Sequence, residues 1–253
     1  MMILRFKTIL ITILAIPVLV FIGYEAVRGA SSGDPEGYRN AKIVHGALLY
    51  DKWYEVKDVD TSGNHPLYPT TGKKEGATTW RCKECHGWDY IGKDGRYSKG
   101  SHFTGIKGIY DARTSKPQEL HDSLIDTSKN HDLSDYLAGS DVWAIVKFIR
   151  EGLIDIRTVI NDAGNIKGNP ENGKSLYASL CSKCHGKDGG EIDFNKMEGI
   201  QGVGWLSNDN PQESLHKIRW GHPGSDMPSA VVDGRLSDSE TFDILSYIQT
   251  LKK

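Results

Sequence analysis

Two pentapeptides of one pattern contain all four cysteines of the chain: Cys82-Lys83-Glu84-Cys85-His86 and Cys181-Ser182-Lys183-Cys184-His185. Two thiols separated by two residues can form thioether bonds to the vinyl groups of a haem, and the histidine that follows can ligate its iron. Each motif is followed by a glycine. The pattern therefore predicts two covalently bound haem c groups, one held by Cys82, Cys85 and His86 and one by Cys181, Cys184 and His185.

Three other uses of paired cysteines explain the motifs less well. A thioredoxin-like dithiol gives no reason for a histidine directly after the second cysteine. A four-thiolate zinc site usually brings its two pairs within about 15–20 residues of each other, much closer than these pairs lie. Disulfides within each pair would close very tight loops and would also leave the histidines unexplained. Haem attachment is the interpretation that uses every residue of both motifs.

The two halves of the chain repeat one another beyond these motifs. Residues 46–50 align with 173–177, residues 105–109 with 199–203, residues 117–121 with 211–216 after one insertion, and residues 137–149 with 236–248. In the last of these segments, Ser237 and Glu240 form a capping-box pattern, and Ile244, Leu245 and Ile248 recur at helical spacing. Each half is therefore expected to begin and end with a helix around its haem motif.

This order of helix, haem motif, irregular stretch and aromatic-rich final helix resembles the class I cytochrome c family over about residues 40–253. The resemblance implies an all-α fold with two class I cytochrome c-like domains in tandem, each wrapped around a covalent haem. The expected boundaries are an apolar helix at 1–30, a first domain at 31–160, a linker at 161–170 and a second domain at 171–253. The first domain departs from the pattern through an insertion at about residues 55–80, which is either a surface spacer or a loop that shapes a site beside the haem.

The ligand opposite each attachment histidine decides the haem potential and whether small molecules can bind the iron. In the second half, Met227 precedes Pro228 at the place where class I cytochromes carry their methionine ligand, with Met197 as the alternative. The first half has no methionine after Met2. His131 lies one position from the register of Met227 and is the predicted ligand there; His102, or an open iron, remains possible.

The other histidines are expected to have ordinary structural roles. His121 and its counterpart His216 recur in both halves, although the second half already has a methionine ligand, so both are predicted to be structural. Surface or hydrogen-bonded roles are expected for three more, His45, His65 and His222. The aromatic residues flanking the first motif, Trp80, Trp88 and Tyr90, are expected to pack on the porphyrin edge or to bond a propionate.

The first residues of the chain predict export. Arg5 and Lys7 precede an apolar run from Thr8 to Tyr24, which is typical of a signal peptide or of a membrane anchor. Both interpretations place the remainder on the periplasmic side of the bacterial inner membrane, anchored or released by cleavage, and a retained anchor is favoured. The formal net charge of −2 argues against nucleic acid as a partner.

These expectations indicate a dihaem c-type cytochrome that carries electrons between respiratory or other redox partner proteins, with a membrane respiratory complex as one candidate partner. A bis-histidine haem has a lower potential than a histidine–methionine haem in a similar setting. Electrons would therefore enter at the first haem and leave from the second. The alternative is an enzyme or small-ligand sensor with a reactive first haem, similar in plan to dihaem peroxidases. The carrier is favoured, because both irons have a candidate ligand on each side.

Overall fold

The computed structural model of the chain describes residues 33–129, 131–194 and 199–252. Over these ranges the fold is helical and contains no strand, only the isolated bridges Gly92–Lys107 and Ile160–Ile166. The α-helices are α1 (Glu36–Asn40), α2 (Ile43–Lys57), α3 (Cys82–His86), α4 (Pro117–Ile125), α5 (Gly139–Lys147), α6 (Ile156–Val159), α7 (Pro170–Leu180), α8 (Ser182–His185), α9 (Val203–Asp209), α10 (Pro211–Trp220) and α11 (Asp238–Ile248). The apolar segment at residues 1–30 lies outside the described ranges, and no helix inside them has the length and apolar character needed to cross a bilayer.

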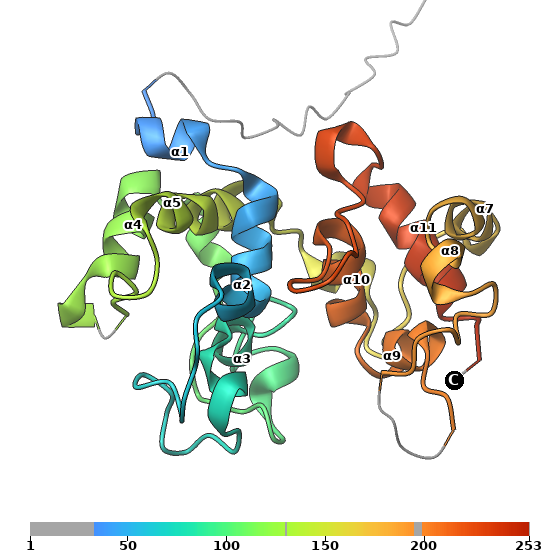
Figure 1. Cartoon of the computed structure of the whole chain (residues 1–253), viewed down its shortest axis with the longest axis horizontal. Coiled ribbons are helices and arrows are strands. Elements are labelled where there is room, and N and C mark those ends of the chain that lie inside the picture. Colours follow the sequence, from blue (N-terminus) through green and yellow to red (C-terminus); the bar gives the residue numbers. More distant parts are fainter. Residues whose placement is uncertain (1–32, 130, 195–198, 253) are drawn as a thin grey trace, which may run out of the picture.

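The helices form two lobes, which lie side by side in Figure 1: a first lobe of α1–α5 and a second lobe of α7–α11. Each lobe is built on the same crossing of its first long helix over its last, α2 over α5 and α7 over α11. Glycine makes both crossings close. A Cβ atom at Gly46 would lie 1.9 Å from the carbonyl oxygen of Ala144, and one at Gly173 would lie 1.8 Å from that of Asp243. A larger residue at either glycine would therefore push the paired helices apart.

Matching contacts support the sequence repeat. The hydroxyl of Tyr50 donates to the carbonyl of Gly87 at 2.6 Å, and Tyr177 donates to Gly186 at 2.8 Å, in each case to the glycine that follows the haem motif. Backbone bonds also recur at aligned positions, since Ile109 donates to Tyr90 at 2.8 Å and Val203 donates to Gly189 at 3.0 Å. The aligned residues thus form equivalent local structures in the two lobes.

The final helices begin as the sequence predicts and end differently. Ser237 and Glu240 form the expected capping box: the Glu240 backbone donates to Ser237 Oγ at 3.3 Å, and Glu240 Oε2 accepts from the Ser237 backbone at 2.8 Å. The first lobe differs at the other end of the helix, where α5 widens into a π-helical segment, Phe148–Gly152. The predicted helix of the first half therefore continues past its expected end in a different geometry.

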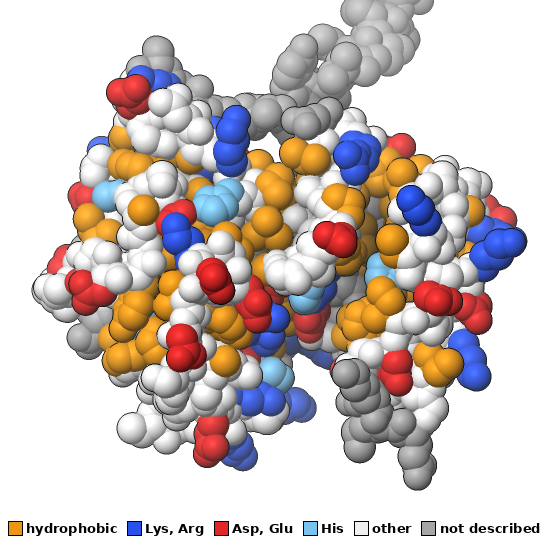
Figure 2. Space-filling model, viewed as in Figure 1, with side chains coloured by type: hydrophobic (Ala, Val, Ile, Leu, Met, Phe, Trp, Pro, Cys, Tyr) orange, Lys and Arg blue, Asp and Glu red, His pale blue; other side chains and the backbone are white. Residues whose placement is uncertain are grey.

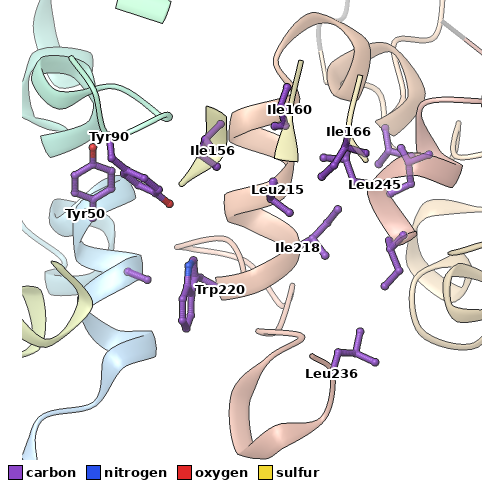
Figure 3. Close-up of a cluster of buried hydrophobic side chains, with 14 of the residues drawn as sticks. Tyr50, Tyr90, Ile156, Ile160, Ile166, Leu215, Ile218, Trp220, Leu236 and Leu245 are labelled. Atoms are coloured by element: carbon purple, nitrogen blue, oxygen red, sulfur yellow. The ribbon is translucent and has the colours of Figure 1, made fainter. Parts of the chain in front are cut away.

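A shared core joins the two lobes. Figure 3 shows Tyr50 and Tyr90 of the first lobe near Trp220 of α10, with the helical segment around Ile156 between the lobes. His216 of α10 is buried in this core, with Nδ1 3.0 Å from the Tyr90 hydroxyl and Nε2 3.2 Å from the Ala47 carbonyl. The predicted structural role of His216 is thus confirmed, and the lobes form one continuous structure.

A buried ion cluster reinforces this contact. Lys217 of α10 donates to Asp51 of α2 at 2.8 Å, and Arg81 pairs with the other carboxylate oxygen of Asp51. Asp51 is fully buried. Burial acts to raise the pKa of Asp51, but the charges of Lys217 and Arg81 outweigh it and hold that pKa far below its usual range.

The insertion of the first half and the expected linker are both packed structures. Within residues 55–80, Trp80 donates from Nε1 to the Gly63 carbonyl at 3.0 Å, and the ring of His65 lies edge-on to Trp80 with centroids 4.6 Å apart. In residues 161–170, the side chain of Gln249 donates to the Gly164 carbonyl at 2.8 Å and accepts from the backbone of Ile166 at 3.1 Å. Neither segment is a loose connection.

Candidate haem sites

The first motif forms the single turn of helix α3. Cys82 and Cys85 are three residues apart and therefore lie on one face of the turn. Gly87 ends the helix with φ +81°, a backbone angle that favours glycine. Burial raises the pKa of both thiols to about 12. The cysteines are therefore uncharged thiols, unlike the low-pKa pair of a redox dithiol, and both are free of disulfides.

His86 is held in one orientation and one tautomer. Its Nδ1 lies 2.8 Å from the backbone carbonyl of Lys107, which accepts the Nδ1 proton. Burial is the main cause that lowers the pKa of His86 to about 4, so the ring is neutral. The lone pair of a neutral imidazole that donates from Nδ1 is on Nε2, which is the arrangement of a metal-binding histidine with a second hydrogen-bonded partner.

His131 lies opposite His86. The ring centroids are 5.9 Å apart and the ring planes are nearly perpendicular, at 87°. A zinc–imidazole bond is about 2.0–2.1 Å long and the ring centre lies roughly 1 Å beyond the nitrogen, so two imidazoles on opposite sides of one metal ion place their centres roughly 6 Å apart. Burial lowers the pKa of His131, and a hydrogen bond with the Ser123 backbone opposes that shift. The separation of the two ring centres is therefore the separation expected for two imidazoles that share one iron atom.

The alternative ligand His102 is engaged elsewhere. Its Nδ1 lies 2.7 Å from Glu84 Oε1, and its ring stacks on Tyr97 with centroids 4.8 Å apart. Glu84 is fully buried and also pairs with Lys83 at 2.9 Å. The structure thus brings His131 and His86 together and places His102 in a separate polar cluster. We refer to Cys82, Cys85, His86 and His131 as site 1.

The second motif forms α8, with Cys181 at the start of the turn and Gly186 closing it at φ +77°. Cys184 is exposed, and burial raises the pKa of Cys181 to about 11. Burial also lowers the pKa of His185, so its ring is neutral. Its Nδ1 is buried and has no hydrogen-bond partner among the described residues. At the position equivalent to Lys107, the carbonyl of Gln201 accepts the backbone N–H of Phe194 at 3.0 Å.

Met227 lies in a tight turn between α10 and α11. Its carbonyl accepts the backbone N–H of His222 at 3.2 Å, and its own N–H donates to Ser225 Oγ at 3.2 Å. Gly221 opens the turn at φ +89°, and a Cβ atom there would lie 2.6 Å from the Met227 carbonyl oxygen. These contacts fix the backbone of Met227, whose side chain is half-buried. Met197, the alternative ligand, lies outside the described residues. We refer to Cys181, Cys184 and His185, together with the predicted ligand Met227, as site 2.

Residues 170–252 match the protein-family model described as Cytochrome c. This segment is a cytochrome c domain. The match begins at the first residue of α7 and extends past the end of α11, so the cytochrome c domain contains the whole of site 2. A domain of this family implies covalently bound haem c and electron transfer. The comparison with curated proteins finds no match to the chain.

The aromatic residues around the first motif differ in part from expectation. The hydroxyl of Tyr90 bonds to His216, and the indole N–H of Trp80 bonds to Gly63, so both polar atoms already have protein partners. Trp88 is buried, and its Nε1 has no partner within the described ranges. The remaining histidines have structural contacts: His45 lies 2.7 Å from Asp141, His121 stacks on Trp143, and His222 lies 2.6 Å from Lys217.

The sequence did not predict two groups that affect site 1. The carbonyl of Lys107 orients His86, and in the inserted loop burial and, after it, a charge on His131 lower the pKa of His65. Lys107 belongs to a segment that recurs at residues 199–203, so the repeat contained a signal for it. The position of His65 had no such signal, because the insertion has no counterpart in the second half.

Proposed function

We propose that the chain is a dihaem c-type cytochrome that carries electrons between redox partner proteins outside the cytoplasm. Site 1 would hold one haem through Cys82 and Cys85, with His86 and His131 as axial ligands. Site 2 would hold the other through its two cysteines, with His185 and Met227. The facing imidazoles of site 1, 5.9 Å apart, are the observation that carries this proposal. Bound haem supplies reversible one-electron chemistry at its iron.

The chain's own residues give the two sites different properties. The Lys107 carbonyl fixes His86 and increases its basicity as a ligand. A second imidazole, His131, favours the oxidised state of site 1, whereas the thioether of Met227 favours the reduced state of site 2. Site 1 is therefore the donor side and site 2 the acceptor side of the carrier.

Exposed apolar side chains support site 2 as the exit. Around the second motif, Leu180 is 47% exposed, Phe194 43% and Ile200 63%. Few large apolar side chains in the described part of the chain are this exposed, and these flank the attachment helix α8 in sequence. Electron-transfer partners usually dock through small, weak interfaces, and exposed apolar side chains near the attachment motif in the sequence suit such contact. The apolar segment at residues 1–30 supports export, with the segment retained as an anchor or cleaved.

A reactive first haem is the competing function. It is favoured by one observation, that burial and, after it, the charge of His131 lower the pKa of His65 in the inserted loop. In that case His131 would exchange for a small molecule, and the protein would be a dihaem oxidoreductase or a ligand sensor. The filled ligand geometry of site 1 favours the carrier.

Mass spectrometry combined with potentiometry tests the proposal. We expect the exported protein to carry two haem masses, and a redox titration followed by absorbance to resolve two midpoint potentials with the bis-histidine haem lower. The carrier also predicts that the oxidised protein does not bind cyanide. A single haem mass would contradict the dihaem proposal, and rapid cyanide binding at site 1 would support the reactive haem instead.

A further inference from the structure

The attachment histidines of the two sites differ at one atom, Nδ1. In site 1, the Lys107 carbonyl accepts the Nδ1 proton of His86 at 2.8 Å. In site 2, His185 Nδ1 is buried and has no hydrogen-bond partner among the described residues. An imidazole that binds a metal through Nε2 keeps its proton on Nδ1 and almost always donates it to an acceptor. Site 2 therefore needs an acceptor that corresponds to the Lys107 carbonyl of site 1.

The sequence repeat places a buried acceptor at the corresponding position. Residues 199–203 align with 105–109, so Gln201 corresponds to Lys107. Gln201 Oε1 is buried and, within the described ranges, has no hydrogen-bond partner. Buried side-chain oxygens of this kind are rarely left unpaired, and an amide oxygen can accept two hydrogen bonds. An unpaired donor and an unpaired acceptor thus belong to the two aligned residues that are hydrogen-bonded to each other in site 1.

Contacts of one short segment connect Gln201 to the histidine. The ring centroid of Phe194 lies 6.4 Å from that of His185, and the Phe194 backbone N–H donates to the Gln201 carbonyl at 3.0 Å. The backbone N–H of Gln201 donates to Asp193 Oδ1 at 3.1 Å. The carbonyl of His185 accepts the backbone N–H of Glu191, also at 3.1 Å. The same segment therefore contacts both His185 and Gln201.

The side chain of Gln201 is better placed to accept this proton than its backbone or water. Phe194 already bonds to the Gln201 carbonyl, whereas in the described part of the chain only His86 bonds to the Lys107 carbonyl. Figure 2 shows apolar side chains open to solvent on the second lobe. His185 Nδ1 and Gln201 Oε1, by contrast, each have less than 1 Å² of accessible surface. Because solvent does not reach either atom, each needs a partner from the protein.

We propose that Gln201 is a positioning residue for the iron ligand His185, and that its Oε1 accepts the Nδ1 proton once the Gln201 side chain turns toward the ring. The inference rests on the proposed function, in which His185 ligates the iron of site 2. The hydrogen bond holds the orientation of the ring and makes Nε2 a more basic ligand. A more basic ligand favours oxidised iron, so Gln201 lowers the midpoint potential of the haem in site 2. Because the acceptor is a side chain, its strength depends on the residue type.

Redox titration of the haem-loaded protein with two Gln201 variants tests this role. Gln201→Leu removes the acceptor and keeps a similar volume. It should shift the equilibrium of the site 2 haem toward the reduced state by about tenfold, which raises its midpoint potential by about 59 mV. Gln201→Glu supplies a stronger acceptor and should lower the same midpoint. A role in packing alone would move the two variants in the same direction, and that result would overturn the proposal.

The matched control is the aligned position in site 1, where the acceptor is a backbone carbonyl. Lys107→Gln and Lys107→Leu remove the same charge and leave that carbonyl in place. The midpoint potential of the haem in site 1 should therefore be the same in these two variants. A difference between them as large as that between Gln201→Leu and Gln201→Glu would overturn the proposal, because side-chain type would then matter without a side-chain acceptor.

A spectroscopic measurement follows the hydrogen bond itself. In reduced protein labelled with ¹⁵N-histidine, the NMR signal of His185 Nδ1 should move in opposite directions in Gln201→Leu and Gln201→Glu. A midpoint and an Nδ1 signal unchanged in Gln201→Leu would overturn the inference and leave the proposed function standing. A wild-type protein without haem in site 2, shown by mass spectrometry, would overturn both. If Gln201→Leu does not load haem, Gln201→Glu decides, since a raised or unchanged midpoint there contradicts the proposal.

Discussion

Sites 1 and 2 share one motif and one helix crossing but differ in how completely the protein surrounds them. At site 1, His86 has a carbonyl partner and an imidazole opposite it, and both cysteine thiols are largely buried. At site 2, His185 Nδ1 has no partner among the described residues, and Cys184 is exposed. The inserted loop and the contact with α10 enclose the first lobe. The comparison indicates a repeated unit in which the surroundings of the motif, more than the motif itself, differ between the two sites.

Removing the cysteines of one site should have the largest effect. Cys82→Ala with Cys85→Ala, and Cys181→Ala with Cys184→Ala, should each yield a protein with one haem, because the thioether bonds hold the group. The first pair should also reduce the amount of folded protein more, since Cys82 packs against the core that the lobes share and against the separate core of the first lobe. Haem content per chain and circular dichroism measure these outcomes. Two haems remaining in either variant would show that the motif is not an attachment site.

Exchanging the axial ligands should reverse the difference between the two haems. His131→Met should raise the midpoint potential of the haem in site 1, and Met227→His should lower the midpoint potential of the haem in site 2. Each shift should be on the order of 100 mV, because thioether sulfur favours ferrous iron more than imidazole does. Spectroelectrochemistry resolves the two waves. His102→Met is the control, since His102 bonds to Glu84, and it should leave both midpoints nearly unchanged. A shift for His102→Met but not for His131→Met would reverse the ligand assignment.

Loss of the buried carboxylate between the lobes should destabilise the whole structure. Asp51→Asn removes the buried countercharge that Arg81 and Lys217 share, which should cost about 3–5 kcal/mol in the free energy of unfolding. Because Lys217 and Arg81 depress the pKa of Asp51, its contribution is complete above the unfolded-state pKa of about 3.9 and is lost as the pH falls further.

Urea denaturation at neutral and acidic pH measures this effect. The gap between wild type and Asp51→Asn should be largest at pH 7 and should narrow below about pH 4. Glu213→Gln is the control, because Glu213 is partly exposed and lies 3.6 Å from Lys217; it should cost less than about 1 kcal/mol. Equal stability of wild type and Asp51→Asn at pH 7 would rule out a role for the cluster in joining the lobes.

The smallest expected effect tests whether the two lobes are copies of one unit. Tyr50→Phe and Tyr177→Phe each remove one hydrogen bond, to the Gly87 or the Gly186 carbonyl, and each should cost about 1 kcal/mol of stability. Thermal unfolding of both variants beside Tyr54→Phe, whose hydroxyl has no partner in the described ranges, gives the comparison. If the two variants lose very different amounts of stability, the aligned tyrosines do not have equivalent roles in the two lobes.

The regular helices and their order were predictable, because the same sequence pattern occurs in both halves of the chain. The capping box at Ser237 is confirmed, and α2 and α7 contain the aligned glycines and tyrosines. The π-helical end of α5 was not predictable, because its hydrophobic pattern matches that of α11, which lacks it. Such an irregularity depends on packing against the rest of the fold, which local propensity does not contain.

The residues of the candidate sites were predictable where a side chain itself would bind the haem or its iron. The motifs located Cys82, Cys85 and His86, and the alignment of the halves led to His131. The acceptor for His86 is a backbone carbonyl, and any residue could supply it, so the identity of Lys107 gave no indication. Tyr90 was expected to pack on the porphyrin edge or to bond a propionate. Its hydroxyl bonds His216, a partner from the neighbouring lobe that the motif alone does not reveal.

Near-infrared magnetic circular dichroism of the oxidised protein tests the central claim most directly, because the energy of its charge-transfer band distinguishes bis-histidine from histidine–methionine haem. We expect two low-spin bands of equal intensity, one for each ligand pair, with the histidine–methionine band lost in Met227→His. A single band, or a high-spin signal from site 1, would contradict the assignment of two filled haem sites with different ligands.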